Sequence, residues 1–158
     1  MPTGITMRER SGWRDEAISR RHRLWGVELQ ATDIDWLVSE YRSESGDIRP
    51  AAIVEYKKGF ANSPDLNSPQ YIVIGKLATR ADLPFFVCHY TADCSQFSVT
   101  PANGWAKKIL SCTKNFSEED YIRLGFFLRG YPKNSPECER AIKNLKQQSN
   151  TAGQSSLF

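Results

Sequence analysis

The sequence contains few of the residues that bind zinc or form disulfides. Its 158 residues include two histidines and four cysteines (Cys88, Cys94, Cys112 and Cys138), and no two cysteines have the C-x-x-C spacing. A structural zinc site needs four such ligands at short spacings, so this composition argues against one. Scattered cysteines without a pairing pattern are typical of a reducing compartment. We therefore expect a cytoplasmic protein.

Long apolar runs are also absent. No segment approaches the roughly 20 consecutive apolar residues that a membrane-spanning helix needs, and residues 1–10 contain no apolar stretch of the signal-peptide type. We expect neither export nor a membrane partner. The length fits one domain, and a hydrophobic fraction of 40% with 25% charged residues is ordinary for a globular protein.

The formal net charge is only +3, but arginine is concentrated near the N-terminus. The run contains Arg8, Arg10, Arg14, Arg20, Arg21 and Arg23. Arginine suits bidentate contact with phosphate, so Arg20, Arg21 and Arg23 are candidate phosphate contacts, and His22 lies among them. The alternative for the arginines is a solvated helix face. For His22 the alternative is a histidine packed against Trp25.

Apolar periodicity and turn signals predict a mixed α/β fold. The expected elements are a helix over 11–25, strands over 31–41 and 51–59 that form an antiparallel hairpin, a helix over 70–81, strands over 83–90 and 96–100, and helices over 117–129 and 135–148. Residues 70–81 also suit a strand, but their length and Pro69 near the first turn favour a helix. The strongly apolar run over 83–90 is typical of a central strand. One mixed β-sheet flanked by helices follows.

The composition changes near the C-terminus. Residues 147–156 are glutamine, serine, asparagine, threonine, alanine and glycine, which bury too little apolar surface to fold. We therefore predict a domain over 1–146 and a disordered tail over 147–158. The tail ends in two apolar residues, Leu157 and Phe158.

Acidic residues and a lysine alternate along the two strands of the predicted hairpin. Side chains two residues apart on a strand share a face, so Asp33 lies with Asp35, and Glu55 lies with Lys57. Carboxylates that are buried together require a cation, and Mg²⁺ (or Mn²⁺) commonly binds one or two carboxylates plus a substrate phosphate. Lys57 would then orient a nucleophilic water and stabilise charge on the phosphate. The alternative is a surface hairpin on which Glu55 and Lys57 form an exposed pair.

Three short patterns carry a family resemblance. They are R-H-R-x-W-G over 21–26, D-I-D plus an aromatic residue over 33–36, and A-x-V-E-Y-K over 52–57. Together they resemble the PD-(D/E)XK superfamily of metal-dependent nucleases, which includes restriction endonucleases and Holliday-junction resolvases, and more closely a bacterial and phage group with these patterns. The resemblance covers about residues 15–90.

The resemblance implies a restriction-endonuclease-like fold and a Mg²⁺-dependent DNA endonuclease-like phosphodiester hydrolase. By the same resemblance Asp35 and Glu55 bind the metal, and Lys57 assists catalysis. Glu16 matches a helical acid that some members add to the metal site. Asp33 departs from the simplest pattern, which needs one acid, and is either the principal ligand or a partner of it.

Alternatives to this function stay open. One is a non-catalytic DNA- or clamp-binding adaptor that retains the nuclease fold, and another is an RNA- or nucleotide-directed hydrolase with the same site. Gln70 and Lys76 lie where some members of the superfamily keep an accessory polar residue, whereas His89 ends a buried strand and is expected to be structural. DNA is the expected partner, and a homodimer is also compatible.

The last five residues, Q-S-S-L-F, resemble the Q-x-x-L-F peptide by which bacterial replication and repair proteins dock on the DNA polymerase sliding clamp. A flexible tether would present Leu157 and Phe158 to a hydrophobic pocket, and Gln154 would supply a directed hydrogen bond. We therefore expect the clamp to recruit the protein to replicating or repaired DNA. The alternative is an accidental end to a polar tail.

Overall fold

The computed structural model describes residues 16–25, 28, 31–42, 46–60 and 64–154. The chain divides into two compact units, Met1–Asp33 and Ile34–Phe158, each of which is considered by itself. The first unit contains α1 (Glu16–Trp25), which lies within the helix predicted for this part of the sequence.

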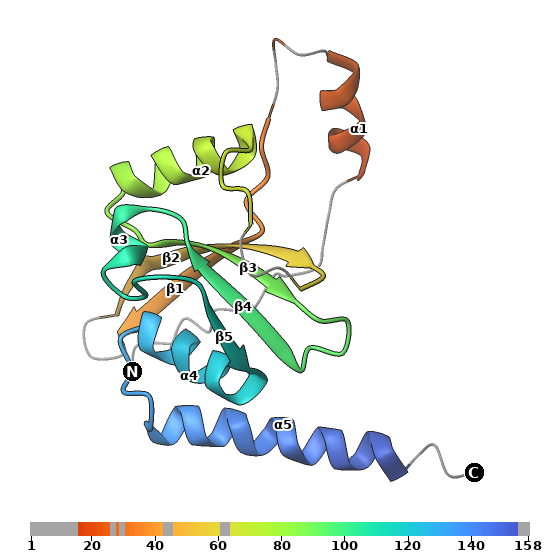
Figure 1. Cartoon of the computed structure of the whole chain (residues 1–158), viewed down its shortest axis with the longest axis vertical. Coiled ribbons are helices and arrows are strands. Elements are labelled where there is room, and N and C mark those ends of the chain that lie inside the picture. The colour runs from red at the N-terminus through yellow and green to blue at the C-terminus, as the bar shows by residue number, and fades with distance from the viewer. Residues whose placement is uncertain (1–15, 26–27, 29–30, 43–45, 61–63, 155–158) are drawn as a thin grey trace. The chain divides into compact units, whose positions relative to one another are not determined.

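The second unit is built on a mixed five-stranded sheet (Figure 1). Its strands are β1 (Trp36–Arg42), β2 (Asp47–Lys58), β3 (Phe85–Tyr90), β4 (Gln96–Pro101) and β5 (Lys114–Ser117), side by side in this order. The β2–β3 pair is parallel, and the other neighbouring pairs are antiparallel. The structure therefore confirms the predicted α/β class, the β1–β2 hairpin and the central position of β3.

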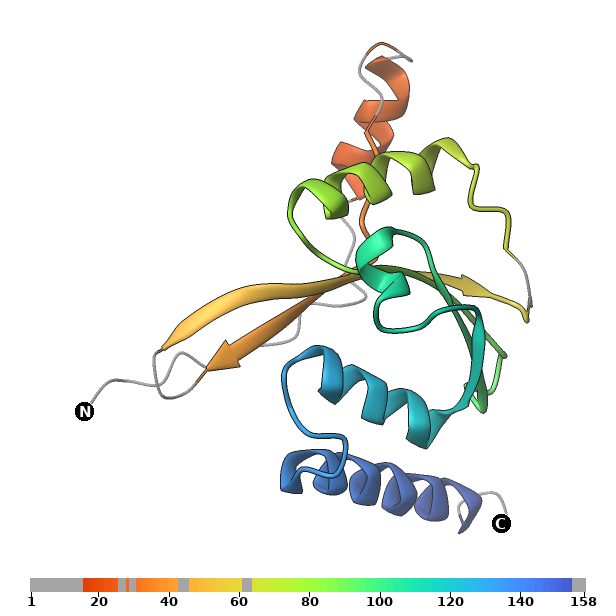
Figure 2. The same ribbon diagram turned by 60° about the vertical axis from the view of Figure 1, so that its left-hand side comes forward.

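Helices cover both faces of this sheet. In Figure 2, α2 (Pro69–Arg80) lies above the sheet, and α4 (Glu118–Leu128) and α5 (Pro136–Gln154) lie below it. Alternate residues of the central strands enter two separate cores. Ile53 on β2 packs in the core under α2, and its neighbour Val54 packs in the core on the α4 side. Odd-numbered residues of β2 near Ile53 therefore point toward α2, and even-numbered residues point toward α4.

Capping residues explain where the flanking helices begin. Ser68 accepts a hydrogen bond from the Tyr71 amide at 3.3 Å, and Pro69 occupies the first position of α2. Ser117 caps α4 in the same way through the Asp120 amide at 3.2 Å. Both helices confirm the sequence prediction. Their starts were predictable because a cap depends on a few neighbouring residues.

Two short elements are missing from the sequence prediction. One is α3 (Gly104–Lys107), a single turn capped by Asn103, and the other is β5. Each spans four residues. Neither is long enough to show a periodic apolar pattern, which is the signal on which the prediction depended.

The start of β1 and the end of α5 also differ from the prediction. The strand begins at Trp36, so residues 31–35 precede it. The last helix continues to Gln154, so residues 147–154 are helical and not part of a disordered tail. Ile142 is buried and anchors the helix, and propagation from a formed helix adds one hydrogen bond per residue even where side chains are polar.

Candidate functional site

The start of the hairpin brings two predicted site residues together. The register pairs Trp36 with Val54, which sets Asp35 opposite Glu55. The Asp35 amide donates to Glu55 Oε1 at 2.9 Å, and the Tyr56 amide donates to Asp35 Oδ2 at 2.9 Å. Each carboxylate thus accepts a hydrogen bond from a backbone N–H group. In a longer pair of β-strands, that N–H group would donate to a backbone carbonyl instead. These two hydrogen bonds lie just before the first residue of β1 and hold the two acids side by side.

Glu55 lies in the interior of the molecule. The residue has no exposed surface, and Gln70 Nε2 donates to its Oε2 at 3.0 Å. Burial raises the pKa of the Glu55 carboxyl, and the nearby Asp35 charge raises it further. The hydrogen bond from the Asp35 amide and the charge of Lys57 act in the opposite direction. The raised pKa means that the folded protein favours the protonated form of Glu55 more than water does.

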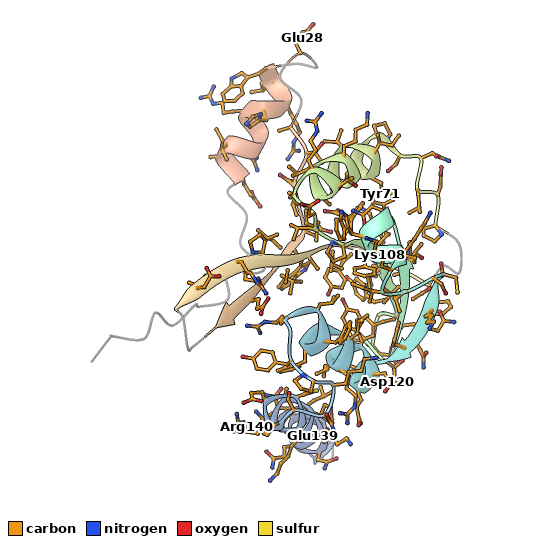
Figure 3. All side chains as sticks on the ribbon, turned by 90° about the vertical axis from the view of Figure 1, so that its left-hand side faces the viewer. Glu28, Tyr71, Lys108, Asp120, Glu139 and Arg140 are labelled. Atoms are coloured by element: carbon orange, nitrogen blue, oxygen red, sulfur yellow. The ribbon has the colours of Figure 1, made fainter. Side chains whose placement is uncertain are left out.

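The first turn of α2 contributes two residues to this centre. Gln70 contacts Glu55 directly, and the Lys57 ammonium lies 5.9 Å from the centroid of the Tyr71 ring. Burial raises the pKa of Tyr71, as do the charges of Glu55 and Asp35. Tyr71 projects from α2 toward the sheet (Figure 3). The sequence prediction missed Tyr71, although the Ser68 cap was a legible sign that the next residues form a first turn.

His89 lies next to Lys57, although the sequence favoured a purely structural role for it. The parallel register pairs these two residues. Burial lowers the pKa of His89, and the charge of Lys57 lowers it further. Its neighbourhood was not predictable, because the sequence does not state how two strands separated by a helix are aligned.

Other predicted residues belong to the first unit. Glu16 forms an exposed ion pair with Arg20 at 3.5 Å, and the His22 ring lies 4.7 Å from the Trp25 ring, as the packing alternative requires. Asp33 is the last residue of this unit. Metal binding by Glu16 and Asp33 and phosphate contact by Arg20, Arg21, His22 and Arg23 stay predictions. Among the described residues, no group of three or more histidine, cysteine or acidic side chains is placed to hold a metal ion.

The proposed clamp-binding peptide falls at the edge of what the structure describes. Gln154 is the last residue of α5, and Leu157 and Phe158 lie outside the described residues. Clamp binding stays a prediction. In the part of the chain that the structure covers, no helix is long and apolar enough to cross a membrane.

The arrangement suits oxygen-based chemistry. A carboxylate has four lone-pair directions over its two oxygens, so Asp35 and Glu55 can accept the hydrogen bonds described above and still ligate a cation. All ligands offered are oxygens, which hard divalent ions prefer. Lys57 places a positive charge on the same face.

Comparison with known proteins points away from nucleases. A stretch of 74 residues is 36% identical to the protein named urease accessory protein UreF of Klebsiella pneumoniae (strain 342). The match covers 46% of this chain and 33% of that protein, so the chain spans about a third of the length of this relative. No family model and no solved structure matches the chain.

The similarity to a urease accessory protein overturns the resemblance to PD-(D/E)XK nucleases. The DNA endonuclease function is therefore wrong, and so is the alternative of an adaptor that retains the nuclease fold. Clamp binding depended on a different pattern and is not affected. The physical reason for the error is that D-I-D and E-Y-K are short: they specify which side chains share a face of a hairpin, and they do not specify an enzyme family. The restriction-endonuclease-like detail of the fold is likewise not confirmed, whereas the mixed sheet flanked by helices is.

Proposed function

We propose that Asp35 and Glu55 bind a hard divalent cation, Mg²⁺ or Mn²⁺, and that the cation binds a phosphate-bearing ligand. The observation that carries the proposal is the fully buried Glu55 carboxyl, which accepts from the Asp35 amide, beside the Asp35 carboxyl, which accepts from the Tyr56 amide. Adjoining carboxylates repel each other, and Glu55 loses its hydration on burial, whereas Asp35 is exposed. A divalent ion offsets both costs at neutral pH, where protonation does so only in part.

The phosphate-bearing ligand follows from the small number of protein ligands. Two carboxylates fill only part of the octahedral shell of Mg²⁺, and proteins commonly leave the remaining positions to water and phosphate oxygens. The Lys57 ammonium adds a charge suited to such a ligand. DNA is one ligand of this class.

Titration with Mn²⁺ tests the proposal. We expect wild-type protein to bind Mn²⁺ and expect Glu55→Gln and Asp35→Asn each to weaken binding by about tenfold or more, because each removes one charged oxygen ligand. Asp82→Asn is the matched control, since Asp82 is an exposed acid at φ 56°, a conformation that asparagine adopts readily. Equal affinity in wild type and Glu55→Gln would exclude the proposed centre.

A second candidate function is accessory: binding to another enzyme. The similarity to a urease accessory protein favours it. The test is co-elution of the purified full chain with purified urease. We expect a complex that survives Glu55→Gln, because that substitution lies in the interior. Separate elution at concentrations well above micromolar would exclude this candidate.

A further inference from the structure

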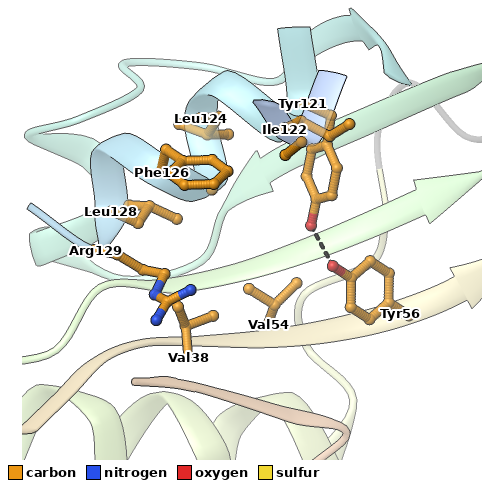
Figure 4. A pocket seen from close by; sticks show the side chains of 11 residues that line it. Val38, Val54, Tyr56, Tyr121, Ile122, Leu124, Phe126, Leu128 and Arg129 are labelled. Atoms are coloured by element: carbon orange, nitrogen blue, oxygen red, sulfur yellow. Dashed lines mark hydrogen bonds between the residues drawn. The ribbon is translucent and has the colours of Figure 1, made fainter. Parts of the chain in front are cut away.

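A cavity of about 360 Å³ lies between the sheet and the helices α4 and α5 (Figure 4). Its mainly apolar walls include Val38 and Val54 from the sheet, Leu124 and Leu128 from α4, and Ala141 from α5. Protein interiors contain few voids larger than a water molecule. The volume of this cavity instead falls within the range of roughly 300–1,000 Å³ that is typical of small-molecule sites. The cavity is therefore large enough to hold a small ligand.

A glycine keeps part of this cavity open. Gly125 lies in the interior of α4 and lines the cavity. Apart from its chain neighbours and the backbone of its own helix, a Cβ atom added there would meet no atom within 4 Å. Its φ is not positive, so neither the backbone conformation nor a close contact requires glycine at this position. Glycine destabilises a helix interior relative to alanine, yet a larger side chain here would fill the cavity.

Arg129 supplies a positive charge to the same cavity. Its Nε donates to the Ser39 carbonyl at 2.8 Å, which holds the guanidinium group in place, and no described residue accepts a hydrogen bond from its two Nη groups. Glu40 lies close to Gly130 but forms its ion pair with Arg49, at 2.8 Å. A guanidinium group donates to a carboxylate through two parallel N–H groups. The free Nη groups of Arg129 therefore suit a carboxylate.

The remainder of the cavity offers a ligand little polar contact. The hydroxyl groups of Tyr56 and Tyr121 hydrogen-bond each other, and Figure 4 shows this pair separated from the Arg129 guanidinium by Val54. Among the described residues that line the cavity, Arg129 alone carries a charge. One cation beside apolar walls suits a ligand with one negative charge and an apolar body.

We propose that this cavity binds a small carboxylic acid, with its carboxylate on the Arg129 guanidinium and its apolar body along Val54 and Gly125. This binding is separate from the cation centre on the α2 side and goes beyond the function proposed above. A monocarboxylate fits better than a polyanion, because a second negative charge would lie against apolar walls without a partner.

Three probes that share one alkyl chain and differ in the head group test the proposal: octanoate, 1-octanol and octylamine. Each is titrated into the full chain by isothermal calorimetry. We expect octanoate to bind, and 1-octanol to bind about tenfold more weakly, because a neutral hydroxyl makes a weaker hydrogen bond to the guanidinium than a carboxylate does. Octylamine should not bind measurably, because its charge is repelled by Arg129.

Two substitutions separate the roles of the cavity and of the charge. Gly125→Leu fills the cavity and should abolish binding of both octanoate and 1-octanol. Gly104→Leu is the matched control, since a Cβ atom at Gly104 also meets nothing within 4 Å and this residue does not line the cavity. Arg129→Met removes the charge from an unbranched side chain, and it should weaken octanoate binding by about tenfold while 1-octanol binding stays close to wild type.

Thermal unfolding confirms that each variant is folded, and Gly125→Leu should be at least as stable as wild type. If Arg129→Met does not fold, the contrast between octanoate and 1-octanol in wild type tests the charge alone. Equal affinity for these two probes, unchanged octanoate binding in Gly125→Leu, or no binding of octanoate by wild type would each overturn the proposal. None of these results bears on Mn²⁺ binding, so this proposal and the proposed cation centre fail separately.

Discussion

The two faces of β2 present opposite chemistry from alternate residues. On the α4 side, the Tyr56 hydroxyl hydrogen-bonds the hydroxyl of Tyr121, 65 residues away in the sequence (Figure 4). On the α2 side, Glu55 and Lys57 belong to the cluster with Asp35. The same strand thus contributes a hydrogen-bonded pair of tyrosines to one face. To the other face it contributes a buried carboxyl group beside a second carboxyl group and a lysine.

The tyrosine hydroxyls and the Arg129 Nε on the α4 side form their hydrogen bonds within the protein. This side borders a cavity of about 360 Å³ with mainly apolar walls, and Arg129 at its edge donates to the Ser39 carbonyl at 2.8 Å. Burial raises the pKa of the Cys88 thiol to about 12, so this thiol stays protonated and unreactive at neutral pH. These hydroxyl and Nε groups pair within the protein, whereas the α2 face holds carboxyl groups that a cation would neutralise. Both faces carry a hydrophobic core, and the proposed cation binding is confined to the α2 face.

Truncation of the core on the α4 side should have the largest effect on stability. Phe86 is 1% exposed and packs in the core that includes Leu124. We expect Phe86→Ala to lower the free energy of unfolding by about 3–5 kcal/mol, through lost burial and the cavity left behind. Urea denaturation measures this change. Mn²⁺ affinity of the folded variant should be unaltered, and a parallel loss of Mn²⁺ affinity would break the division between the faces.

The α2 face should instead limit stability as pH rises. Because burial raises the folded-state pKa of Glu55 above its ordinary value of 4.5, the protonated form is favoured in the folded protein. Stability of the metal-free protein should therefore fall as pH rises through 4.5 and up to the folded-state pKa. Glu55→Gln should flatten this dependence and be at least as stable as wild type at pH 7.

Chemical denaturation in EDTA between pH 4 and pH 8 measures the dependence. A wild-type stability that rises over this window would contradict the burial argument, as would a Glu55→Gln profile that parallels wild type.

Substitutions at the two serine N-caps, one on α2 and one on α4, compare the two faces through smaller changes in stability. Ser68→Ala and Ser117→Ala each remove one side-chain acceptor from the first turn of a helix, and each should cost about 1 kcal/mol of stability. Gln70 lies in the first turn of α2 and holds Glu55, so only Ser68→Ala should also weaken Mn²⁺ binding. Equal Mn²⁺ affinity in the two variants would show that α2 does not position the centre.

The smallest expected change in the free energy of unfolding comes from a substitution on the α4 side. Tyr121→Phe removes one hydroxyl of the Tyr56–Tyr121 pair and should cost about 1 kcal/mol or less, because the ring and its packing remain. Thermal unfolding measures the cost. A change in Mn²⁺ affinity in this variant would show that the two faces are coupled through β2.

The sequence predicted the part of the centre that depends on local geometry. Parity on β2 put Glu55 and Lys57 on one face, and the short turn of the hairpin brought Asp35 opposite Glu55. Pro69 near the first turn favoured a helix over 70–81, which placed Gln70 at its start. These features were legible because each depends on a few neighbouring residues.

Long-range contacts were not predictable in this way. The pairing of His89 with Lys57 depends on the alignment of two parallel strands, and that of Tyr56 with Tyr121 depends on how α4 packs on the sheet. Short segments such as β5 lack a periodic signal. The family assignment failed for a related reason, since it extended three short patterns to a whole protein.

The response of thermal stability to Mn²⁺ tests the cation centre most directly. A ligand that binds only the folded state at 100 times its dissociation constant adds about 2.7 kcal/mol, which is roughly 5–10 °C in Tm for a domain of this size. We predict such a shift for wild type and for Asp82→Asn, and a loss of about half of it or more in Asp35→Asn and Glu55→Gln, since tenfold weaker binding leaves about 1.4 kcal/mol at the same Mn²⁺ concentration. No shift in wild type, or an equal shift in all four proteins, would contradict cation binding by Asp35 and Glu55.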